Sequence, residues 1–307
     1  MQTSPFLVSA LRSVEFGVPD MAAAEEFFTG TWNLTVADRV GDTVYLRGTG
    51  ADHHLLALRP SPLAMLDSLT LRATSMQALN QIAVNVVQHG GTVLAARAPV
   101  SGPGGGEALT VRDPQGRILR FVHGDALHAD TTGHKDRPIC LAHAVLNSHD
   151  VAAGLQFYEK ALGMRLSDRT RIMAFIRIPQ SAAGDHHSIA LADADNDCLN
   201  HVAFVMPDVE SVMRGGGRMK DAGYAIEWGP GRHGPGDNAF NYFVGPAGFV
   251  IEYTCDVEQV DENYVAGTPD DWKWPPGRVD QWGISAPPSA RLKEAQKQIS
   301  FAPGIRA

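Results

Sequence analysis

The amino-acid sequence predicts an α+β protein of two domains that share one order of elements: a strand, a helix and then several strands. Two stretches, LRSVEFGVPDMAAAEEFF from Leu11 and LAHAVLNSHDVAAGLQFY from Leu141, match along their length. Their aspartates, Asp20 and Asp150, each stand where a side chain can cap the helix that follows. At 307 residues the chain also has the length of about two domains. An internal repeat of this kind indicates two copies of one structural unit.

Two further pairs of segments extend the match through both halves of the chain. DHHLLAL matches DHHSIAL, and DPQGRILRFV matches GPAGFVIEYT. We therefore expect one domain over residues 1–130 and a second over residues 137–307, joined by the polar stretch HADTTGHKDRP. Each domain is long enough to bury a core of its own.

Hydrophobic patterning predicts the elements of the second half in turn. Residues 151–162 are predicted to form a helix, because apolar side chains fall on one face and Gly163 can end it. A second helix is expected over residues 209–222, loosened by the glycines at 215–217. Short apolar and β-branched runs predict strands at residues 141–147, 171–178, 187–191, 200–205, 225–228, 241–244 and 249–254. The tail after Cys255 is rich in Trp and Pro and is expected to pack over a domain face or a site.

Charge, apolar runs and cysteine content exclude several classes of partner, location and site. Hydrophobic residues make up 44% of the chain and charged residues 20%, and the formal net charge is −8. A negative charge without a basic cluster argues against nucleic acid or an anionic membrane as partner. No apolar run of about 20 residues and no leader with a basic start is found, so the cytoplasm is the expected location. Three cysteines without a C-x-x-C pair disfavour a zinc–thiolate site and a disulfide framework.

One carboxylate stands out because it lies inside an apolar, β-rich run. Glu252 in GFVIEYT would be costly to bury without a partner. His143 in LAHAVLN and His201 in LNHVAFVM are flanked by residues that favour a buried strand. Two imidazoles and one carboxylate on separate strands are the ligand set of the facial triad, which holds Fe(II) on one side and leaves the other side open. The sequence therefore predicts a metal site.

The first half provides a comparison for this prediction. Ser13 stands where His143 stands in the repeat, and Arg120 stands where Glu252 stands. The equivalent of His201 falls near Ser68. No candidate ligand is kept in the first copy, so we expect one metal per chain, bound by the second copy.

At this point the motifs carry a resemblance to a known family. The paired halves and the series LAHAVLN, GDHHSIAL, LNHVAFVM, GPGRH and NYFVGPAGFVIEY resemble the type I extradiol ring-cleaving dioxygenases of the vicinal oxygen chelate superfamily, relatives of catechol 2,3-dioxygenase and dihydroxybiphenyl dioxygenase. The resemblance covers nearly the whole chain and is strongest in the second half. It implies tandem βαβββ modules, two per domain, in the vicinal oxygen chelate or glyoxalase-like fold. It also implies Fe(II), or Mn(II) as in some members, with His143, His201 and Glu252 as ligands.

The resemblance further implies a reaction and the residues that assist it. Both atoms of O2 would be inserted next to the vicinal hydroxyls of a catechol, giving a product of the hydroxymuconic semialdehyde type. His187 would be the acid/base beside the oxygen site, with His233 and Tyr242 hydrogen-bonding the substrate oxygens. The implied partners are a catecholic small molecule and O2, and we expect a homo-oligomer, a tetramer or an octamer.

Neighbouring residues receive less specific roles. Met173 and Phe175, in the predicted strand 171–178, are expected to face the aromatic ring of the substrate. His186 precedes His187 in a predicted strand, so the two would point to opposite faces and His186 is assigned to packing. His54 has the local sequence of His187 without a metal beside it and is interpreted as structural.

Two other functions stay open on the same scaffold. One is a metal-dependent lyase or isomerase of the glyoxalase type. Such an enzyme would be expected to draw ligands from both halves, but Ser13 and Arg120 in the first half cannot bind a metal. The other is a non-catalytic small-molecule binding protein, which would have no reason to keep both the ligand set and His187. An alkyl- or aryl-substituted catechol and a trihydroxylated ring fit the sequence equally well.

Overall fold

The computed structural model describes residues 6–129 and 134–305. Within them the chain builds four units of one kind, each a strand, a helix and three further strands. The first half comprises β1 Val8–Val18, α1 Met21–Glu26 with the helical turn Phe27–Thr31, β2 Thr35–Val40, β3 Thr43–Arg47 and β4 Leu56–Pro60, followed by β5 Met65–Ala73, α2 Met76–Gln88, β6 Thr92–Pro99, β7 Glu107–Arg112 and β8 Ile118–His123.

The second half repeats this order. It comprises β9 Leu141–Ser148, α3 Val151–Leu162, β10 Arg165–Arg169, β11 Met173–Arg177 and β13 Ile189–Asp193, followed by β14 Cys198–Val205, α4 Val209–Asp221, β15 Trp228–Arg232, β16 Ala239–Val244, the turn Pro246–Gly248 and β17 Val250–Cys255. The short strands β12 Gly184–Asp185 and β18 Gln259–Val260 pair with each other, and α5 Ala290–Ala295 and β19 Ile299–Phe301 follow the long tail. The predicted tandem βαβββ fold is thus confirmed.

The helix ends follow the predicted capping. The Asp20 carboxylate accepts a hydrogen bond from the Ala23 backbone N–H at 3.0 Å, and Asp150 accepts one from Ala153 at 2.9 Å. Gly163 ends α3 in the left-handed conformation, with φ of 71°. These local signals place each helix directly after the first strand of its unit.

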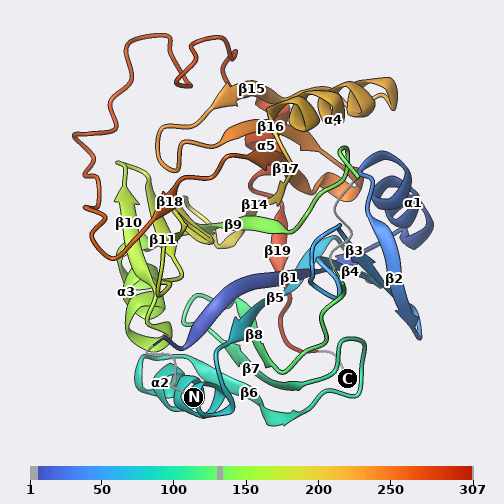
Figure 1. The fold of residues 1–307 in the computed structure, drawn as a ribbon, viewed down its shortest axis with the longest axis vertical. Coiled ribbons are helices and arrows are strands. Elements are labelled where there is room, and N and C mark those ends of the chain that lie inside the picture. Colours follow the sequence, from blue (N-terminus) through green and yellow to red (C-terminus); the bar gives the residue numbers. More distant parts are fainter. Residues whose placement is uncertain (1–5, 130–133, 306–307) are drawn as a thin grey trace.

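Strand pairing is the same in the two halves. β1 runs antiparallel to β5 and parallel to β4, and β5 runs parallel to β8. In the second half β9 runs antiparallel to β14 and parallel to β13, and β14 runs parallel to β17. Figure 1 shows the first half in blue to green along the bottom and the right-hand side, and the second half in yellow-green to red at the left and the top. Each half therefore forms a curved sheet whose inner face collects side chains from several strands.

The two halves are joined by contacts far apart in the sequence. β19 pairs with β14 through Cys198 and Ser300, and with β5 through Ser300 and Met65. The Trp32 ring stacks on Tyr253, with ring centroids 3.6 Å apart. The predicted joint lies over residues 128–138, of which 130–133 fall outside the described residues, so the domain boundary stays a prediction.

Three predicted elements differ from the structure. The strand predicted at 187–191 begins at Ile189, which leaves His187 in the preceding loop. The strand predicted at 225–228 instead spans 228–232. Gly and Pro residues normally indicate a loop, but here they lie in a strand whose register with β16 is irregular. The glycines of α4 do not loosen it, since the Gly215 position lies directly against the Tyr253 ring, where a Cβ would be 2.7 Å from a ring carbon.

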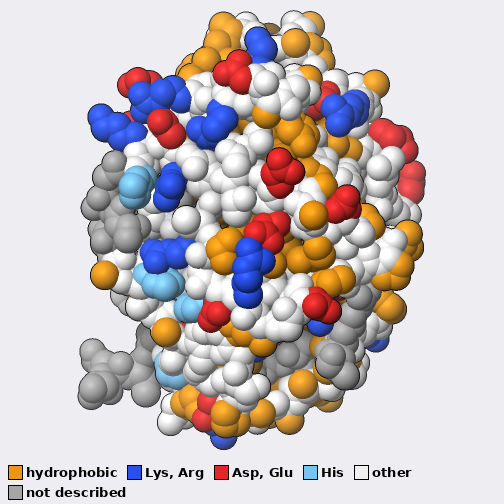
Figure 2. Space-filling view, turned by 90° about the vertical axis from the view of Figure 1, so that its right-hand side faces the viewer, with side chains coloured by type: hydrophobic (Ala, Val, Ile, Leu, Met, Phe, Trp, Pro, Cys, Tyr) orange, Lys and Arg blue, Asp and Glu red, His pale blue; other side chains and the backbone are white. Residues whose placement is uncertain are grey.

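None of the helices in the described ranges has the length and apolar character that a bilayer crossing requires. Figure 2 shows the face on the right-hand side of Figure 1, where Lys and Arg side chains are interspersed with Asp and Glu side chains.

Candidate metal centre

Three neighbouring strands bring the predicted ligands together. Ala203 on β14 pairs with His143 on β9 at one side and with Glu252 on β17 at the other. His201 lies two residues before Ala203, so its side chain shares a face with that position. One donor atom of His143, His201 and Glu252 each lies within 4.8 Å of the other two, and all three residues are buried. This convergence follows from the register of the sheet.

The two histidines approach the same carboxylate oxygen. The Nε2 atom of His143 is 3.1 Å from Glu252 Oε2, and that of His201 is 3.3 Å from it. Burial alone would raise the pKa of Glu252, but the charge of His143 and the hydrogen bonds from the histidines hold it well below its usual range. Burial lowers the pKa of His201 to about 4, against the opposing pull of Glu252. The site thus presents an ionised carboxylate beside a His201 imidazole that is neutral near pH 7, and both are in the protonation state that metal binding needs.

Neighbouring amides orient two of these side chains. Asn200 Oδ1 lies 2.8 Å from His201 Nδ1, so the Nδ1–H donates to it and the Nε2 lone pair faces the centre. Asn238 donates to Glu252 Oε1 at 3.4 Å. Among the described residues His143 Nδ1 has no hydrogen-bond partner. Two imidazole nitrogens and one carboxylate oxygen, all buried and convergent, fit a divalent transition metal with open positions on one side.

The residues predicted to assist the reaction lie around this cluster. The His187 ring centroid is 4.3 Å from that of His143. Tyr242 places its hydroxyl 3.4 Å from His201 Nε2 and 3.0 Å from His233 Nε2. Burial and the negative charge of Glu252 raise the pKa of Tyr242 well above its usual value, so the hydroxyl keeps its proton.

His187 is linked to a buried aspartate that the sequence interpretation missed. Asp168 accepts a hydrogen bond from His186 Nε2–H at 2.9 Å, and the Nδ1 atoms of His186 and His187 are 3.0 Å apart. A neutral His186 that donates through Nε2 must accept through Nδ1, so His187 donates from Nδ1 and keeps its Nε2 lone pair. Gly267 N–H and the Tyr264 hydroxyl also donate to Asp168, at 2.6 and 3.3 Å. His186 therefore orients His187, which corrects its assignment to packing alone.

The electrostatic state of His187 agrees with this chain of hydrogen bonds. Burial, together with the repulsion that protonated His143 or His186 would exert, lowers the pKa of His187 well below its usual value. The side chain is thus neutral near pH 7 and can accept a proton. Because it lies in a loop before β13, the parity argument from a strand was wrong, although His187 does face the cavity.

A cavity of about 680 Å³ opens over this cluster. Met173 and Phe175 lie on its wall, and their contact with a substrate ring stays a prediction. Its other lining side chains include aromatic residues from β15 and the tail, and basic residues from the loop before β11 and the C-terminal segment: Trp228, Trp272, Trp274, Arg171, Lys293 and Lys297. The predicted role of the tail over a site is consistent with Trp272 and Trp274, which pack against Gly234.

Comparison with known proteins places this chain in a family. Residues 141–253 match the model of the Glyoxalase/Bleomycin resistance protein/Dioxygenase superfamily. A solved structure described as the Mn(II)-bound glyoxalase from Novosphingobium aromaticivorans is 32% identical, with a TM-score of 0.85, and the match covers 94% of each chain. The chain belongs to this superfamily. The match to the family model contains all three candidate ligands.

Curated members of the superfamily match over shorter stretches. Metapyrocatechase 2 of Cupriavidus necator is 33% identical over 192 residues, which cover 60% of this chain and 51% of that protein. The iron-dependent extradiol dioxygenase of Rhodococcus jostii (strain RHA1) is 29% identical over 193 residues, which cover 52% of this chain and 60% of that protein. The chain thus spans between half and two thirds of the length of these relatives.

Proposed function

We propose that this chain is an extradiol dioxygenase that cleaves the ring of a catechol next to its vicinal hydroxyls. The observation that carries this proposal is the grouping of His143, His201 and Glu252, whose two histidines line one cavity together with His187 and Tyr242. Metapyrocatechase 2 and the iron-dependent extradiol dioxygenase among the relatives support it.

We propose His143, His201 and Glu252 as the ligands of one Fe(II), with Mn(II) as the alternative. The iron-dependent relative supports the first metal and the Mn(II)-bound structural relative the second. A redox metal would supply a docking point for two vicinal oxygens and for O2, and would allow electron density to pass between them.

The chain's own residues would handle the protons. His187 is neutral and oriented, so it can take a proton from a catechol hydroxyl and later return it to the product side. Tyr242 stays protonated and would donate a hydrogen bond to a substrate oxygen, while His233 holds its hydroxyl. Met173 and Phe175 would contact the ring, and the cavity walls would exclude water from it.

The activity is tested with protein loaded anaerobically with Fe(II). Catechol, 3-methylcatechol and 2,3-dihydroxybiphenyl are added in air-saturated buffer, and O2 uptake is recorded with the absorbance of the yellow semialdehyde. We expect one O2 consumed per ring, with both atoms of labelled O2 in the product. Absence of O2 uptake with every catechol by iron-loaded protein would refute the proposal. Light scattering would test the proposed tetramer or octamer.

A second candidate is a metal-dependent isomerase of the glyoxalase type. The name of the Novosphingobium aromaticivorans structure, which matches over nearly the whole chain, favours it. Isomerisation of the hemithioacetal of methylglyoxal and glutathione needs no O2. Turnover of this substrate under argon, without O2 uptake in air with catechols, would favour the isomerase over the dioxygenase.

A further inference from the structure

The first half holds a cavity of its own, separate from the candidate metal centre. Its volume is about 360 Å³, enough for a small organic molecule, and it opens on the inner face of the β1–β8 sheet. Residues from all the strands of this half except β2 line it, together with His54 and the glycine-rich loop at 101–106.

The strand register shows that this cavity is the counterpart of the metal site. Thr70 pairs with Ser13 on one side and with Arg120 on the other, as Ala203 pairs with His143 and Glu252. Arg120 therefore projects a guanidinium where the second half projects the ligand carboxylate. In the first half, the positive charge of Arg120 therefore lies near the position that corresponds to the candidate metal site of the second half.

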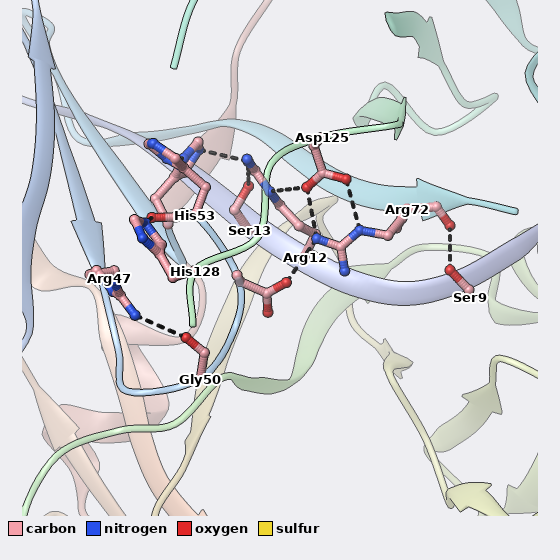
Figure 3. A network of polar contacts seen from close by, with 11 residues as sticks. Ser9, Arg12, Ser13, Arg47, Gly50, His53, Arg72, Asp125 and His128 are labelled. Carbon is pink, nitrogen blue, oxygen red and sulfur yellow. Dashed lines mark hydrogen bonds and ion pairs between the residues drawn. The ribbon is translucent and has the colours of Figure 1, made fainter. Parts of the chain in front are cut away.

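A second arginine, Arg12, also lines this cavity, and Figure 3 shows it within a network of polar contacts with Ser13 and Asp125. The Arg12 Nη1 atom donates to Ser13 Oγ at 3.0 Å and to His54 Nε2 at 2.7 Å, and its Nε lies 3.3 Å from Asp125. Arg72 holds Asp125 from the other side with hydrogen bonds of 2.9 and 2.7 Å. Burial lowers the pKa of Arg12 to about 10, so the buried guanidinium is still a cation at neutral pH.

Arg120 differs from Arg12 in its lack of a partner. No hydrogen bond or ion pair joins its side chain to another residue in the described part of the chain, and it is only partly buried. Glu15, the one carboxylate on the cavity wall within the described residues, is paired with Arg59 at 3.0 Å. A guanidinium that is partly desolvated and unpaired gains most from an anion of its own.

The remaining wall combines the polar side chains of Thr70, Ser101 and Thr110 with an aliphatic part. Tyr45 also lines the cavity, and the aliphatic part is formed by small side chains: Ala57, Ala95, Ala96, Ala98, Val100 and Val122. An inorganic anion would leave this surface without a contact, whereas an organic anion would cover it.

We propose that this cavity binds a small organic carboxylate, with Arg120 pairing the carboxylate and the aliphatic wall contacting its apolar body. Arg12 adds positive potential to the cavity but keeps its own partner, Asp125. Binding here does not depend on the proposed ring cleavage, because no candidate metal ligand contributes to this cavity.

Benzoate is a suitable probe, measured by equilibrium dialysis against the metal-loaded protein. We expect saturable binding of one benzoate per chain, and a loss of affinity of about tenfold or more in Arg120→Gln, because a charge-assisted bidentate pair is removed. Metal content and catechol turnover should not change in this variant. Ala98→Trp, which narrows the mouth from an exposed position, should also weaken binding.

Arg171→Gln is the matched control, because Arg171 lines the cavity over the candidate metal centre. Loss of benzoate binding in Arg171→Gln or on metal removal, with normal binding in Arg120→Gln and Ala98→Trp, would overturn the proposal. Sulfate binding as tightly as benzoate would overturn the organic ligand, since the aliphatic wall would then contribute nothing. Circular dichroism establishes that each variant is folded.

Discussion

The two halves of the molecule share a backbone and differ in what they place on its inner face. In the second half Ala203 lies between His143 and Glu252, and in the first half Thr70 lies between Ser13 and Arg120. The sheets, the capped helices and the strand order are the same. The fold therefore does not depend on the metal ligands, and the site depends on a few side chains that the fold brings together.

The histidine pairs sharpen the comparison. His53 and His54 have their Nδ1 atoms 3.1 Å apart, as His186 and His187 do at 3.0 Å. His54 accepts a hydrogen bond from Arg12, whereas His187 stands beside the candidate ligand His143. The same type of histidine pair therefore lies beside the guanidinium of Arg12 in the first half and beside the proposed metal ion in the second half.

We expect the largest effect on the difference between the two halves when the candidate ligand carboxylate of the second half is neutralised. Glu252→Gln should lose most of its bound iron and nearly all turnover, because a neutral amide is a much poorer ligand for a divalent cation. Arg120→Gln, at the same register position in the first half, is the control and should keep its iron. Metal analysis after anaerobic loading measures both. Full iron occupancy in Glu252→Gln would show that this carboxylate is not a ligand.

Removal of the acid/base histidine should have the next largest effect. His187→Phe should keep its iron and still bind catechol, but its kcat should fall by roughly 10²–10⁴-fold, as is typical for the loss of a positioned acid/base. His54→Gln, its counterpart, should turn over normally. Steady-state O2 uptake and metal content are measured together. Iron loss in His187→Phe would make His187 a ligand, and unchanged kcat would assign it to packing.

Much of this arrangement could be predicted from the sequence, because it rests on local signals and on the repeat. The helix predicted at 151–162 has the bounds of α3, and the structure places Ser68 opposite Glu15 as His201 lies opposite Val145. The internal repeat is therefore sufficient to predict which residues of the first half correspond to the candidate ligands.

Partners from distant parts of the chain could not be predicted in this way. Asp168 meets His186 only because β10 packs beside the loop before β13, and no spacing rule relates the two. Arg12 precedes Ser13 and would point away from it in a regular strand. An irregularity in the β1–β5 register between Leu11 and Ser13 lets both line the same cavity.

Asp168 distinguishes the two histidine pairs, because its counterpart Asp38 shares no hydrogen bond with His53 in the described part of the chain. In Asp168→Asn the amide can donate to His186, which permits the tautomer that no longer fixes His187. We expect kcat to fall by roughly 10–100-fold with iron content unchanged, as for other residues that orient a site through a neighbour. The pH profile of kcat should shift as well. A change in stability alone, with normal kcat, would contradict this orienting role.

The smallest effect should appear in the pH dependence of stability and concerns His54. Burial and the Arg12 charge lower the pKa of His54 to about 2 from its usual 6.5. Below pH 6.5 His54 binds a proton in the unfolded chain but not in the folded chain. The free energy of unfolding therefore decreases as the pH falls. His54→Gln can still accept from Arg12 through its amide oxygen but does not titrate. Urea unfolding between pH 4 and 6 should therefore give a slope that is smaller by about 1.4 kcal/mol per pH unit in the variant. Equal slopes in the two proteins would mean that His54 is protonated in the folded state and does not accept a hydrogen bond from Arg12.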